Sequence, residues 1–431
     1  MNPEKTVVYG KNIEVIGEYD IAVFGGGPAG VCAAIEAARA GKRVFLAEAT
    51  GMLGGMATSG LVGPFMTCYD REGNRPVVGG LFREIVGRLE KNGGAVSPDE
   101  TDAPSIYTSF IARYHKRVTP FDAFMLQTVL DEMTAEAGVT VMLYTRFADC
   151  VVDDDGGIKY ALLLPLEGLR AVRAEVYIDC TGNADVAAAA GVPVWKGDEA
   201  TGIPQPGTLM FEIDGVDSVA YTARPKKPVK AYKMPADGRY KINHYHTYAT
   251  DAADSASMTA AHSEARKQVF EAYSLLKNET PGFENCRITN VAPVLGVRES
   301  RHIEGLYKLR AEDLSAGVKF DDRVAAYAFG MDVHSRNPAE KGNFKVPTAD
   351  VYYVPYASML PKGCRNLLVA GKTVSCESQA AGAIRVMPCA MALGQAAGAA
   401  AAIACDNGVV PSEIDRRRLS DTLRAHGAIL D

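Results

Sequence analysis

The sequence predicts an α/β fold built around a parallel sheet, and three observations near the amino terminus carry this prediction. Residues 20–25 form an apolar run rich in β-branched and aromatic types, which is typical of a buried strand. A glycine-rich turn at 25–30 opens a helix that runs to about Ala40. Residues 43–47 form a second apolar strand. Strand, turn, helix and parallel strand make a βαβ unit, whose crossover is right-handed.

Length and composition narrow the class of protein. The chain has 431 residues, enough for two or three domain-sized units. Its net charge of −6, from 46 Lys and Arg against 52 Asp and Glu, disfavours general nucleic-acid binding. Nine scattered cysteines without a CxxC pair argue against a disulfide scaffold, a metal site or an iron–sulfur cluster. The first residues lack the apolar segment of a signal peptide, so we expect a cytoplasmic protein.

A second helix and five strands are expected beyond residue 120. Asp122 is the expected cap of a helix that carries apolar residues at helical spacing and ends at Gly138. Residues 139–144 then read as another parallel strand. The remaining strands are expected at 147–152, 158–164, 169–174 and 175–180. The first three of these form a β-meander, and the last returns to the buried sheet.

The composition changes along the chain and predicts two domains. Residues 217–290 hold fewer strand patterns and more Tyr, Lys, His and Pro, as expected for a domain inserted into the first. The first domain resumes near 366–371 and closes with an Ala- and Gly-rich helix over 386–404. Small residues supply little membrane-insertion energy, so this helix is expected to be buried rather than to span a membrane. The predicted division assigns 1–85, 120–205 and 345–431 to the first domain, and 206–344 with the loop region 86–119 to an α+β substrate or cap domain.

The turn at 25–30 has the GxGxxG spacing of a dinucleotide site. Gly25 permits the tight turn, Gly27 lets the backbone approach a pyrophosphate, and Gly30 lets the helix pack against the strand. The helix start at Pro28 and Ala29 then faces the phosphate charge.

An acid completes this pattern. Glu48 ends the second strand, 18 positions after Gly30, where a carboxylate can accept the ribose hydroxyls. A glycine-rich turn alone also occurs as plain structure in α/β proteins. Strand, helix, second strand and terminal acid together favour the nucleotide site.

Further segments resemble the FAD-binding segments of two-domain flavoproteins, and so favour FAD over NAD. Residues 53–58 are similar to the segment that lies along the pyrophosphate and the flavin, and residues 178–182 to a strand end near them. Residues 367–371 resemble the late strand whose glycine approaches the ribityl chain, and 382–388 lead into the last helix, whose start faces the pyrimidine edge of the flavin in such relatives. This resemblance assigns to the cofactor Gly54, Gly55, Met56, Thr58, Thr181, Gly182, Gly371, Gly382, Arg385 and Val386.

The sequence as a whole resembles the FAD-dependent oxidoreductases of the fumarate reductase and succinate dehydrogenase flavoprotein superfamily. Within that superfamily it is most similar to the group related to the FAD-binding subunit of heterodisulfide reductases. The segments 296–301 and 385–398 are the most specific parts of the resemblance, and 217–290 carry almost none of it. The resemblance implies a Rossmann-like FAD-binding domain of the glutathione-reductase type.

Several features of related flavoproteins are missing from the sequence. There is no second GxGxxG for NAD(P)H, no CxxxxC redox pair and no clustered thiolate set for iron–sulfur ligation. No His or Cys lies within 48–62, so a covalent flavin link there is not expected, while Cys68, Cys376 and Cys389 leave covalency open. We therefore expect FAD bound without a covalent link and without an iron–sulfur cluster in this chain.

Cationic residues are candidates for binding the flavin or the substrate. Arg385 directly precedes the helix start that is expected to face the flavin, and an ion pair of structural importance is the alternative. Arg298 and Arg301 stand on either side of Glu299, either to bind substrate or to form a buried ion-pair network. On a strand, Arg298, Ser300 and His302 would share one face, with Glu299 and Arg301 on the other.

A carboxylate and an imidazole are the candidates for proton transfer. Asp332 and His334 are two positions apart and would point the same way on a strand. A carboxylate beside an imidazole orients it and raises its basicity, which is the arrangement of a catalytic base. A histidine satisfied in the core or exposed at the surface is the alternative.

Residues 221–248 interleave seven Lys or Arg with five Tyr. Such a stretch can hold single-stranded nucleic acid, an anionic small molecule or another subunit. Because the whole chain is acidic, we expect a loop on the substrate side or a subunit contact in a homo-oligomer.

The leading hypothesis is an FAD oxidoreductase that moves a hydride between a small polar substrate and flavin N5, with an electron acceptor that the sequence does not identify. The alternative is a flavin electron-relay subunit that works with an iron–sulfur or other redox partner protein. A third hypothesis is a protein in which FAD is structural. The position of the 217–290 insertion distinguishes these hypotheses. A small-molecule enzyme needs the insertion to cap the flavin, whereas an electron relay needs the flavin edge to be open.

Overall fold

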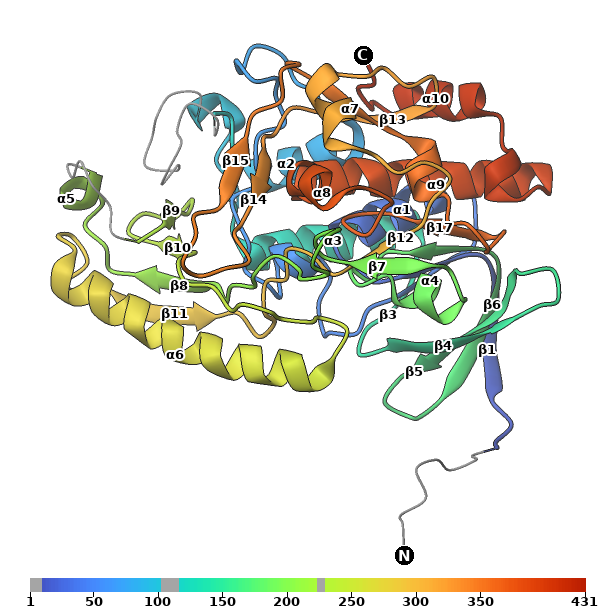
Figure 1. Cartoon of the computed structure of the whole chain (residues 1–431), viewed down its shortest axis with the longest axis horizontal. Helices are drawn as coiled ribbons and strands as arrows, with labels where there is room; N and C mark the ends of the chain where they lie inside the picture. Colours follow the sequence, from blue (N-terminus) through green and yellow to red (C-terminus); the bar gives the residue numbers. More distant parts are fainter. Residues whose placement is uncertain (1–9, 102–115, 223–228) are drawn as a thin grey trace, which may run out of the picture.

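The computed structural model describes residues 10–101, 116–222 and 229–431 (Figure 1). Parts of the segments predicted at 1–85, 86–119 and 217–290 therefore lie outside the described residues.

A seven-stranded sheet forms the centre of the fold, in the order β3-β2-β1-β6-β5-β4, with β17 also paired to β6. β1, β2, β3, β6 and β17 are parallel, whereas β4 and β5 form an antiparallel meander with β6. The strands are β1 Glu14–Phe24, β2 Val44–Ala47, β3 Thr140–Met142, β4 Arg146–Val152, β5 Ile158–Leu164, β6 Arg170–Asp179 and β17 Leu367–Val369. The predicted α/β class and its parallel sheet are confirmed.

Two strand predictions are wrong in their bounds. The strands expected at 169–174 and 175–180 are one strand, β6, because no turn interrupts it: its first half pairs with β5 and its end pairs with β17. The strand expected at 20–25 begins at Glu14, because β1 pairs with β6 along almost its whole length. Residues 14–20 are exposed or half-buried, so they carry no apolar pattern that would reveal a strand.

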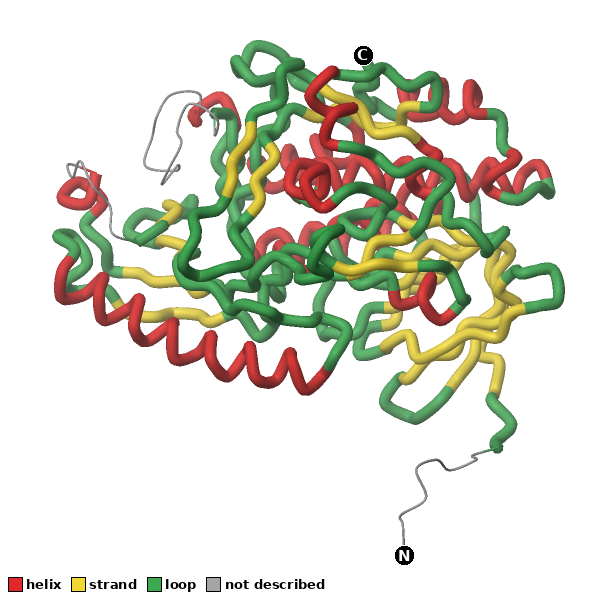
Figure 2. Tube along the Cα trace, viewed as in Figure 1, coloured by secondary structure: helices red, strands yellow, loops and turns green. Residues whose placement is uncertain are grey.

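Helices cover one face of this sheet (Figure 2). The principal ones are α1 Pro28–Arg39, α2 Gly80–Lys91, α3 Ala123–Ala137 and α9 Met387–Asn407. Asp122 caps α3, where its side chain accepts bonds from the N–H groups of Phe124 and Met125, and Gly138 ends the helix in the left-handed conformation, as predicted. Along β1, Ile21 and Val23 face the helices, and Ala22 and Phe24 enter a second core beneath the meander.

The last helix is α9, and it is preceded by a short helix, α8 Ser378–Ile384, that the sequence did not predict. Backbone contact between α9 and α1 requires small residues: a Cβ on Gly394 would lie 2.0 Å from Ala29 O, and one on Gly398 would lie 2.3 Å from Ala33 O. α9 is long and apolar enough to cross a membrane, yet 89% of its most apolar window is buried inside the protein. Burial of this helix, as predicted, is confirmed.

A second, antiparallel sheet has the order β11-β8-β10-β9 and is covered by α6 (Figure 1). Its elements are β8 Phe211–Asp214, β9 Ala231–Lys233, β10 Tyr240–Ile242, α6 Ser255–Glu279 and β11 Arg287–Val291. We call this sheet and helix the cap. The cap has an apolar core of its own, whereas residues 309–331 pack into the core of the central sheet. The domain boundaries stay a prediction.

Short elements complete the chain. The two-stranded pairs are β7 Val194–Lys196 with β12 Arg301–Ile303, β13 Arg323–Tyr327 with β16 Tyr352–Pro355, and β14 Met331–Val333 with β15 Asn343–Lys345. The short helices are α4 Asp185–Ala189, α5 Ser218–Thr222, α7 Ala311–Ala316 and α10 Arg416–Ala425, with 3-10 turns at Gly55–Ala57, Pro98–Thr101, Tyr356–Met359 and Pro411–Glu413.

Candidate functional site

The glycine-rich turn joins β1 to α1, and glycine is needed there for steric reasons. Gly25 has φ +93°, and a Cβ on it would lie 2.4 Å from Cys180 O. A Cβ on Gly30 would lie 1.8 Å from Gly25 O. By contrast, a Cβ on Gly27 would meet nothing nearer than Gly55 Cα, at 4.0 Å. Packing within the protein would therefore allow a side chain at Gly27. A glycine at such a position is consistent with a ligand that lies close to the backbone there.

The surroundings of Gly27 fit a dinucleotide phosphate. Gly27 is the N-cap of α1 and no side chain caps that helix, so its first N–H groups are available to an anion. Gly55, with φ +49°, brings its backbone so close that a Cβ on it would lie 2.9 Å from Gly27 Cα. Met56 follows in the same 3-10 turn and lines the cavity described below. The predicted residues Pro28 and Ala29 form the first turn of α1.

Glu48 follows directly after β2, as predicted, and is buried. Its Oε2 accepts a bond of 2.7 Å from the Gly26 N–H, and its Oε1 accepts bonds of 2.8 Å from the N–H and the hydroxyl of Thr50. The carboxylate is therefore oriented by the turn itself. Its predicted bond to ribose stays a prediction.

Other predicted cofactor residues shape the backbone near the turn. Gly54 and Gly182 are left-handed, with φ +98° and +77°. The hydroxyls of Thr58 and Thr181 donate within their own loops, to Leu53 O at 2.6 Å and to Asp179 Oδ1 at 2.8 Å. These bonds fix the two loops, and the assignment of Thr58 and Thr181 to the cofactor stays a prediction.

Gly371 and Gly382, from the two predicted cofactor segments near the end of the chain, lie close to other elements of the protein. Gly371 is left-handed at φ +92° and follows β17, where a Cβ on it would lie 3.3 Å from Ala29 Cβ at the start of α1. A Cβ on Gly382 would lie 3.0 Å from Asp332 O. Gly382 therefore seats α8 against β14, and its assignment to the cofactor stays a prediction.

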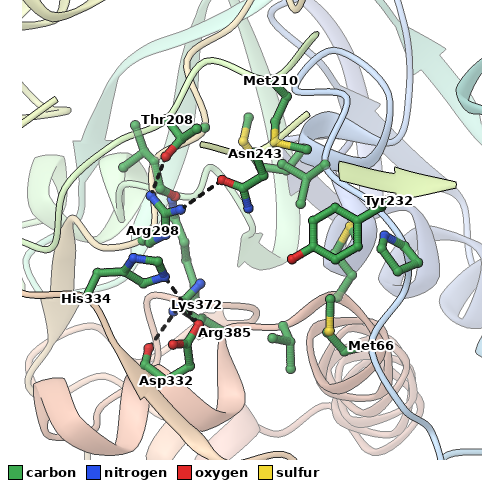
Figure 3. Close-up of a pocket in the computed structure, with 18 of the residues that line it drawn as sticks. Met66, Thr208, Met210, Tyr232, Asn243, Arg298, Asp332, His334, Lys372 and Arg385 are labelled. Atoms are coloured by element: carbon green, nitrogen blue, oxygen red, sulfur yellow. Dashed lines mark hydrogen bonds and ion pairs between the residues drawn. The ribbon is translucent and has the colours of Figure 1, made fainter. Parts of the chain in front are cut away.

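A cavity of about 160 Å³ opens where α9 begins (Figure 3). Val386, the uncapped N-cap of α9, lines it together with Met387. Arg298, His334 and Asp332 gather on one side, opposite Tyr232 and Met66 (Figure 3). The residues that line this inner cavity include Met56, Val62, Gly63, Pro64, Thr208, Met210, Lys230, Asn243, Val297, Phe329, Lys372 and Arg385.

The inner cavity is cationic. Lys230, Arg298, Lys372 and Arg385 line it, against the single carboxylate of Asp332. Burial and the nearby Arg385 charge lower the pKa of Arg298 to about 10 and that of Lys372 to about 8, so both remain largely protonated at neutral pH. Four desolvated cations around one carboxylate, in a chain of net charge −6, favour an anionic ligand.

Arg298 is held firmly within the cavity wall. Its Nη1 donates to Pro206 O at 2.7 Å and to Thr208 Oγ1 at 2.9 Å, and its Nη2 lies 3.5 Å from Asn243 Oδ1. Lys372 is fixed by a bond of 2.6 Å from its Nζ to Val297 O. Both cations are therefore oriented before any ligand arrives.

Asp332 links two other predicted residues. Its Oδ2 lies 3.3 Å from His334 Nε2 and 3.3 Å from Arg385 Nη2, which also donates to Asp332 O at 2.9 Å. Burial would raise the pKa of Asp332, but the bond from His334 and the charge of Arg385 hold it well below its usual range. Burial and Arg298 lower the pKa of His334 to about 4. At neutral pH the pair is a carboxylate and a neutral imidazole.

The structure does not bring Arg301 to the cavity. Its Nη1 pairs with Asp185 Oδ1 at 3.0 Å, on the side of α4. The face assignment for 298–302 is wrong, because only residues 301–303 are a strand and Glu299 lies 3.6 Å from His302. Glu299 is buried and also accepts bonds from Arg336 and Ser378, so it belongs to a structural ion-pair network.

The sequence prediction missed several residues of the cavity wall. Lys230 and Tyr232 lie in the basic and aromatic stretch at 221–248. The composition of this stretch predicted that it lies on the substrate side, but it did not indicate which of its residues contact the cavity. Lys372 directly follows the predicted Gly371. Thr208 and Asn243 stand in no pattern that points to a site, because only their contact with Arg298 gives them a place there.

The residues present fit FAD. The turn at 25–30 and Gly55 leave bare backbone beside the uncapped start of α1. At the inner cavity, α9 also begins without a side-chain cap, and Arg385 Nε is buried with no hydrogen-bond partner among the described residues. Within those residues, no group of three or more His, Cys, Asp or Glu is arranged to hold a metal ion.

Comparisons with curated proteins and solved structures bear on the fold. Among curated proteins, none matches this chain. Among solved structures, the flavin-dependent brominase Bmp2 is 12% identical with a TM-score of 0.51, and the alignment covers 95% of this chain and 83% of that one. BexE, described in terms of oxidation during BE-7585A biosynthesis, is 12% identical with a TM-score of 0.50, covering 95% of this chain and 67% of that one. At such low identity these similarities show the fold alone.

The family described as FAD dependent oxidoreductase matches residues 20–423, nearly the whole chain. This chain belongs to the FAD-dependent oxidoreductase family and is an FAD-dependent enzyme.

Proposed function

We propose that this enzyme exchanges a hydride between its flavin and a small anionic substrate bound in the inner cavity. The observation that carries the proposal is the composition of the cavity wall, which combines four cations with an ionised carboxylate and a neutral imidazole. When bound, FAD supplies the site that accepts or donates the hydride. The residues of the chain hold the substrate and move the accompanying proton.

Arg298 is the residue that we assign to the substrate anion. Its guanidinium is buried, oriented by two carbonyl or hydroxyl acceptors, and not neutralised by any direct ion pair among the described residues. A buried cation without a carboxylate partner is costly unless a ligand compensates it. A carboxylate, phosphate or sulfate group of the substrate would provide that compensation.

Asp332 and His334 are the residues that we assign to the proton. Arg385 contacts the Asp332 carboxylate and keeps it ionised, and the same carboxylate accepts from His334 Nε2. An ionised carboxylate at a cavity wall can take a proton from a substrate hydroxyl or amine as its carbon loses hydride. In the reverse direction the protonated carboxyl returns that proton.

The experiment is an anaerobic titration of the FAD-loaded protein with small 2-hydroxy and 2-amino carboxylates, and of the dithionite-reduced protein with the corresponding 2-oxo carboxylates. We expect one class to bleach, or to restore, the visible flavin band. The Arg298→Gln variant is expected to need a far higher concentration of the same compound. Arg287→Gln is the control, because Arg287 is exposed on the cap and pairs with Asp214. Neutral analogues that react as well as the carboxylates would contradict the proposal.

Electron relay to a partner protein is the second candidate. A relay needs an accessible flavin edge, whereas Tyr232 of the cap and Asn243, which directly follows β10, line the inner cavity together with Arg298. The cap therefore favours the small-molecule enzyme. Membership of the narrower fumarate reductase and heterodisulfide reductase group stays a prediction.

A further inference from the structure

A second hollow lies behind one wall of the inner cavity. Its volume is about 360 Å³, and it is lined by Pro206, Lys230, His246, Tyr248, Asp332, Val333, His334, Ser335, Glu340, Gly342, Asn343 and Phe344. Three of these residues, Lys230, Asp332 and His334, also line the inner cavity. These three residues form the wall that the inner cavity and this outer hollow share.

A continuous hydrogen-bonded path crosses that wall. Asp332 Oδ2 lies 3.3 Å from His334 Nε2, and His334 Nδ1 lies 2.9 Å from His246 Nε2. His246 lines the outer hollow and is absent from the lining of the inner cavity. The two ring nitrogens of His334 thus face opposite ends of the path, one toward the carboxylate and one toward His246.

We propose that Asp332, His334 and His246 form a proton relay, in which His246 exchanges protons with the outer hollow on behalf of the inner cavity. The proposal rests on the proposed function, in which the inner cavity releases or takes up a proton at each turnover. It assigns a role to His246, which lies outside the substrate cavity.

The protonation states of the three side chains allow a proton to pass from each one to the next. Burial, together with nearby cations, holds the pKa of both imidazoles below the usual range, so each is neutral and has one N–H and one lone pair. In the resting arrangement His246 Nε2–H donates to His334 Nδ1, and His334 Nε2–H donates to the Asp332 carboxylate. For inward transfer a proton binds His246 Nδ1 as the Nε2 proton moves to His334 Nδ1 and the His334 Nε2 proton moves to Asp332 Oδ2. The outward direction reverses every one of these steps.

The backbones at both histidines are fixed, which keeps the path aligned. The His334 N–H donates to Gln205 Oε1 at 3.1 Å, and His246 O accepts from Gln268 Nε2 of α6 at 3.1 Å. The charged groups near the path are Arg298, Lys230 and Arg385 on the cavity side and Glu340 in the outer hollow. The cations disfavour a lasting imidazolium, so a proton would cross the path without remaining on it.

The test measures proton uptake rather than turnover. FAD-loaded protein is reduced anaerobically with the methyl viologen radical, which releases no protons, and a pH-indicator dye in weak buffer reports the uptake that accompanies reduction. In His246→Gln the amide can still donate to His334 but cannot pass a proton on. We expect its uptake to be slower by about tenfold or more. His244→Gln is the matched control, because the His244 ring packs at a tilt of 60° against the Tyr245 ring and His244 lines neither cavity.

Chemical rescue distinguishes proton transfer by His246 from a purely structural role of this residue. In His246→Gly, imidazole added to the solution can enter the outer hollow and restore fast uptake, whereas 1-methylimidazole fills the same space but cannot pass a proton between its nitrogens. Wild-type uptake in His246→Gln, or equal rescue by both compounds, would overturn the relay. The assay needs no substrate, so slow uptake in the variants with no reactive carboxylate would uphold the relay and reject the proposed substrate.

Discussion

His334 Nε2 lies 3.3 Å from Asp332 Oδ2, and this contact joins two residues that stand two positions apart at β14. The extended backbone directs both side chains to the same wall, where Arg385 of the α8–α9 junction reaches the same carboxylate at 3.3 Å. The strand β14 therefore supplies the carboxylate, the residue directly after it supplies the imidazole, and a helix junction far along the chain supplies the cation that keeps the carboxylate ionised.

Replacing His334 with Ala is expected to lower the rate of flavin reduction by substrate about 100-fold, with a much smaller effect on substrate binding. The reason is that Asp332 loses the partner that accepts its proton, while Arg298 still holds the anion. Rapid-mixing kinetics separate the limiting rate from the dissociation constant. An unchanged limiting rate would remove His334 from the mechanism.

Arg298→Gln is expected to weaken the binding of simple anions such as sulfate or malonate by about 10- to 100-fold, the loss of a charge-assisted contact. Glutamine keeps polarity at the position but removes the charge. Perturbation of the flavin spectrum gives the dissociation constants, and FAD content verifies that the site is intact. Wild-type anion affinity in this variant would place the substrate anion elsewhere.

Anion binding is expected to weaken as the pH rises through about 8. Burial and the charge of Arg385 lower the pKa of Lys372 to about 8, so its positive charge is present below that pH and is lost above it. Titration of sulfate binding at a series of pH values checks this expectation. In Lys372→Met the step near pH 8 disappears, and in Lys372→Arg the tight binding extends to higher pH. A step of the same size in Lys372→Met would assign it to another group.

Gly27→Ala is expected to fold normally but to bind FAD at least about tenfold more weakly. A Cβ at Gly27 meets nothing nearer than 4.0 Å within the protein, so only a ligand that approaches the backbone there would feel it. Gly30→Ala is the contrasting variant, because its Cβ would lie 1.8 Å from Gly25 O and would disturb the turn itself. Equal FAD affinity in Gly27→Ala and the wild type would argue against close approach of FAD to the backbone at Gly27.

Gly394→Ala is expected to destabilise the protein by about 1–3 kcal/mol, because a Cβ there would lie 2.0 Å from Ala29 O and would push α9 away from α1. Gly87→Ala in α2 is the matched control. A Cβ there meets nothing within 4 Å, so this variant is expected to gain about 0.5–1 kcal/mol. Thermal or denaturant unfolding measures both changes, and comparable stability of the two variants would contradict the close helix contact.

Much of the fold was accessible from sequence because its determinants are local. Apolar runs, the glycines of the turn at 25–30 and the cap residue Asp122 each specify a strand, a turn or a helix start within a few residues. The errors arose where the structure of a segment depends on residues far away in the sequence. The continuous strand β6 and the early start of β1 depend on pairing between distant segments.

The candidate site divides in the same way. The nucleotide turn, the acid Glu48 and the Asp332–His334 pair could be predicted from the sequence, because each is a spacing along one segment. The folded structure was needed to show that Arg298 faces the cavity while Arg301 turns to Asp185, and that Lys230, Lys372 and His246 join the site. The physical reason is that a spacing fixes direction only within one element, whereas the meeting of several elements at one cavity follows from how their cores pack.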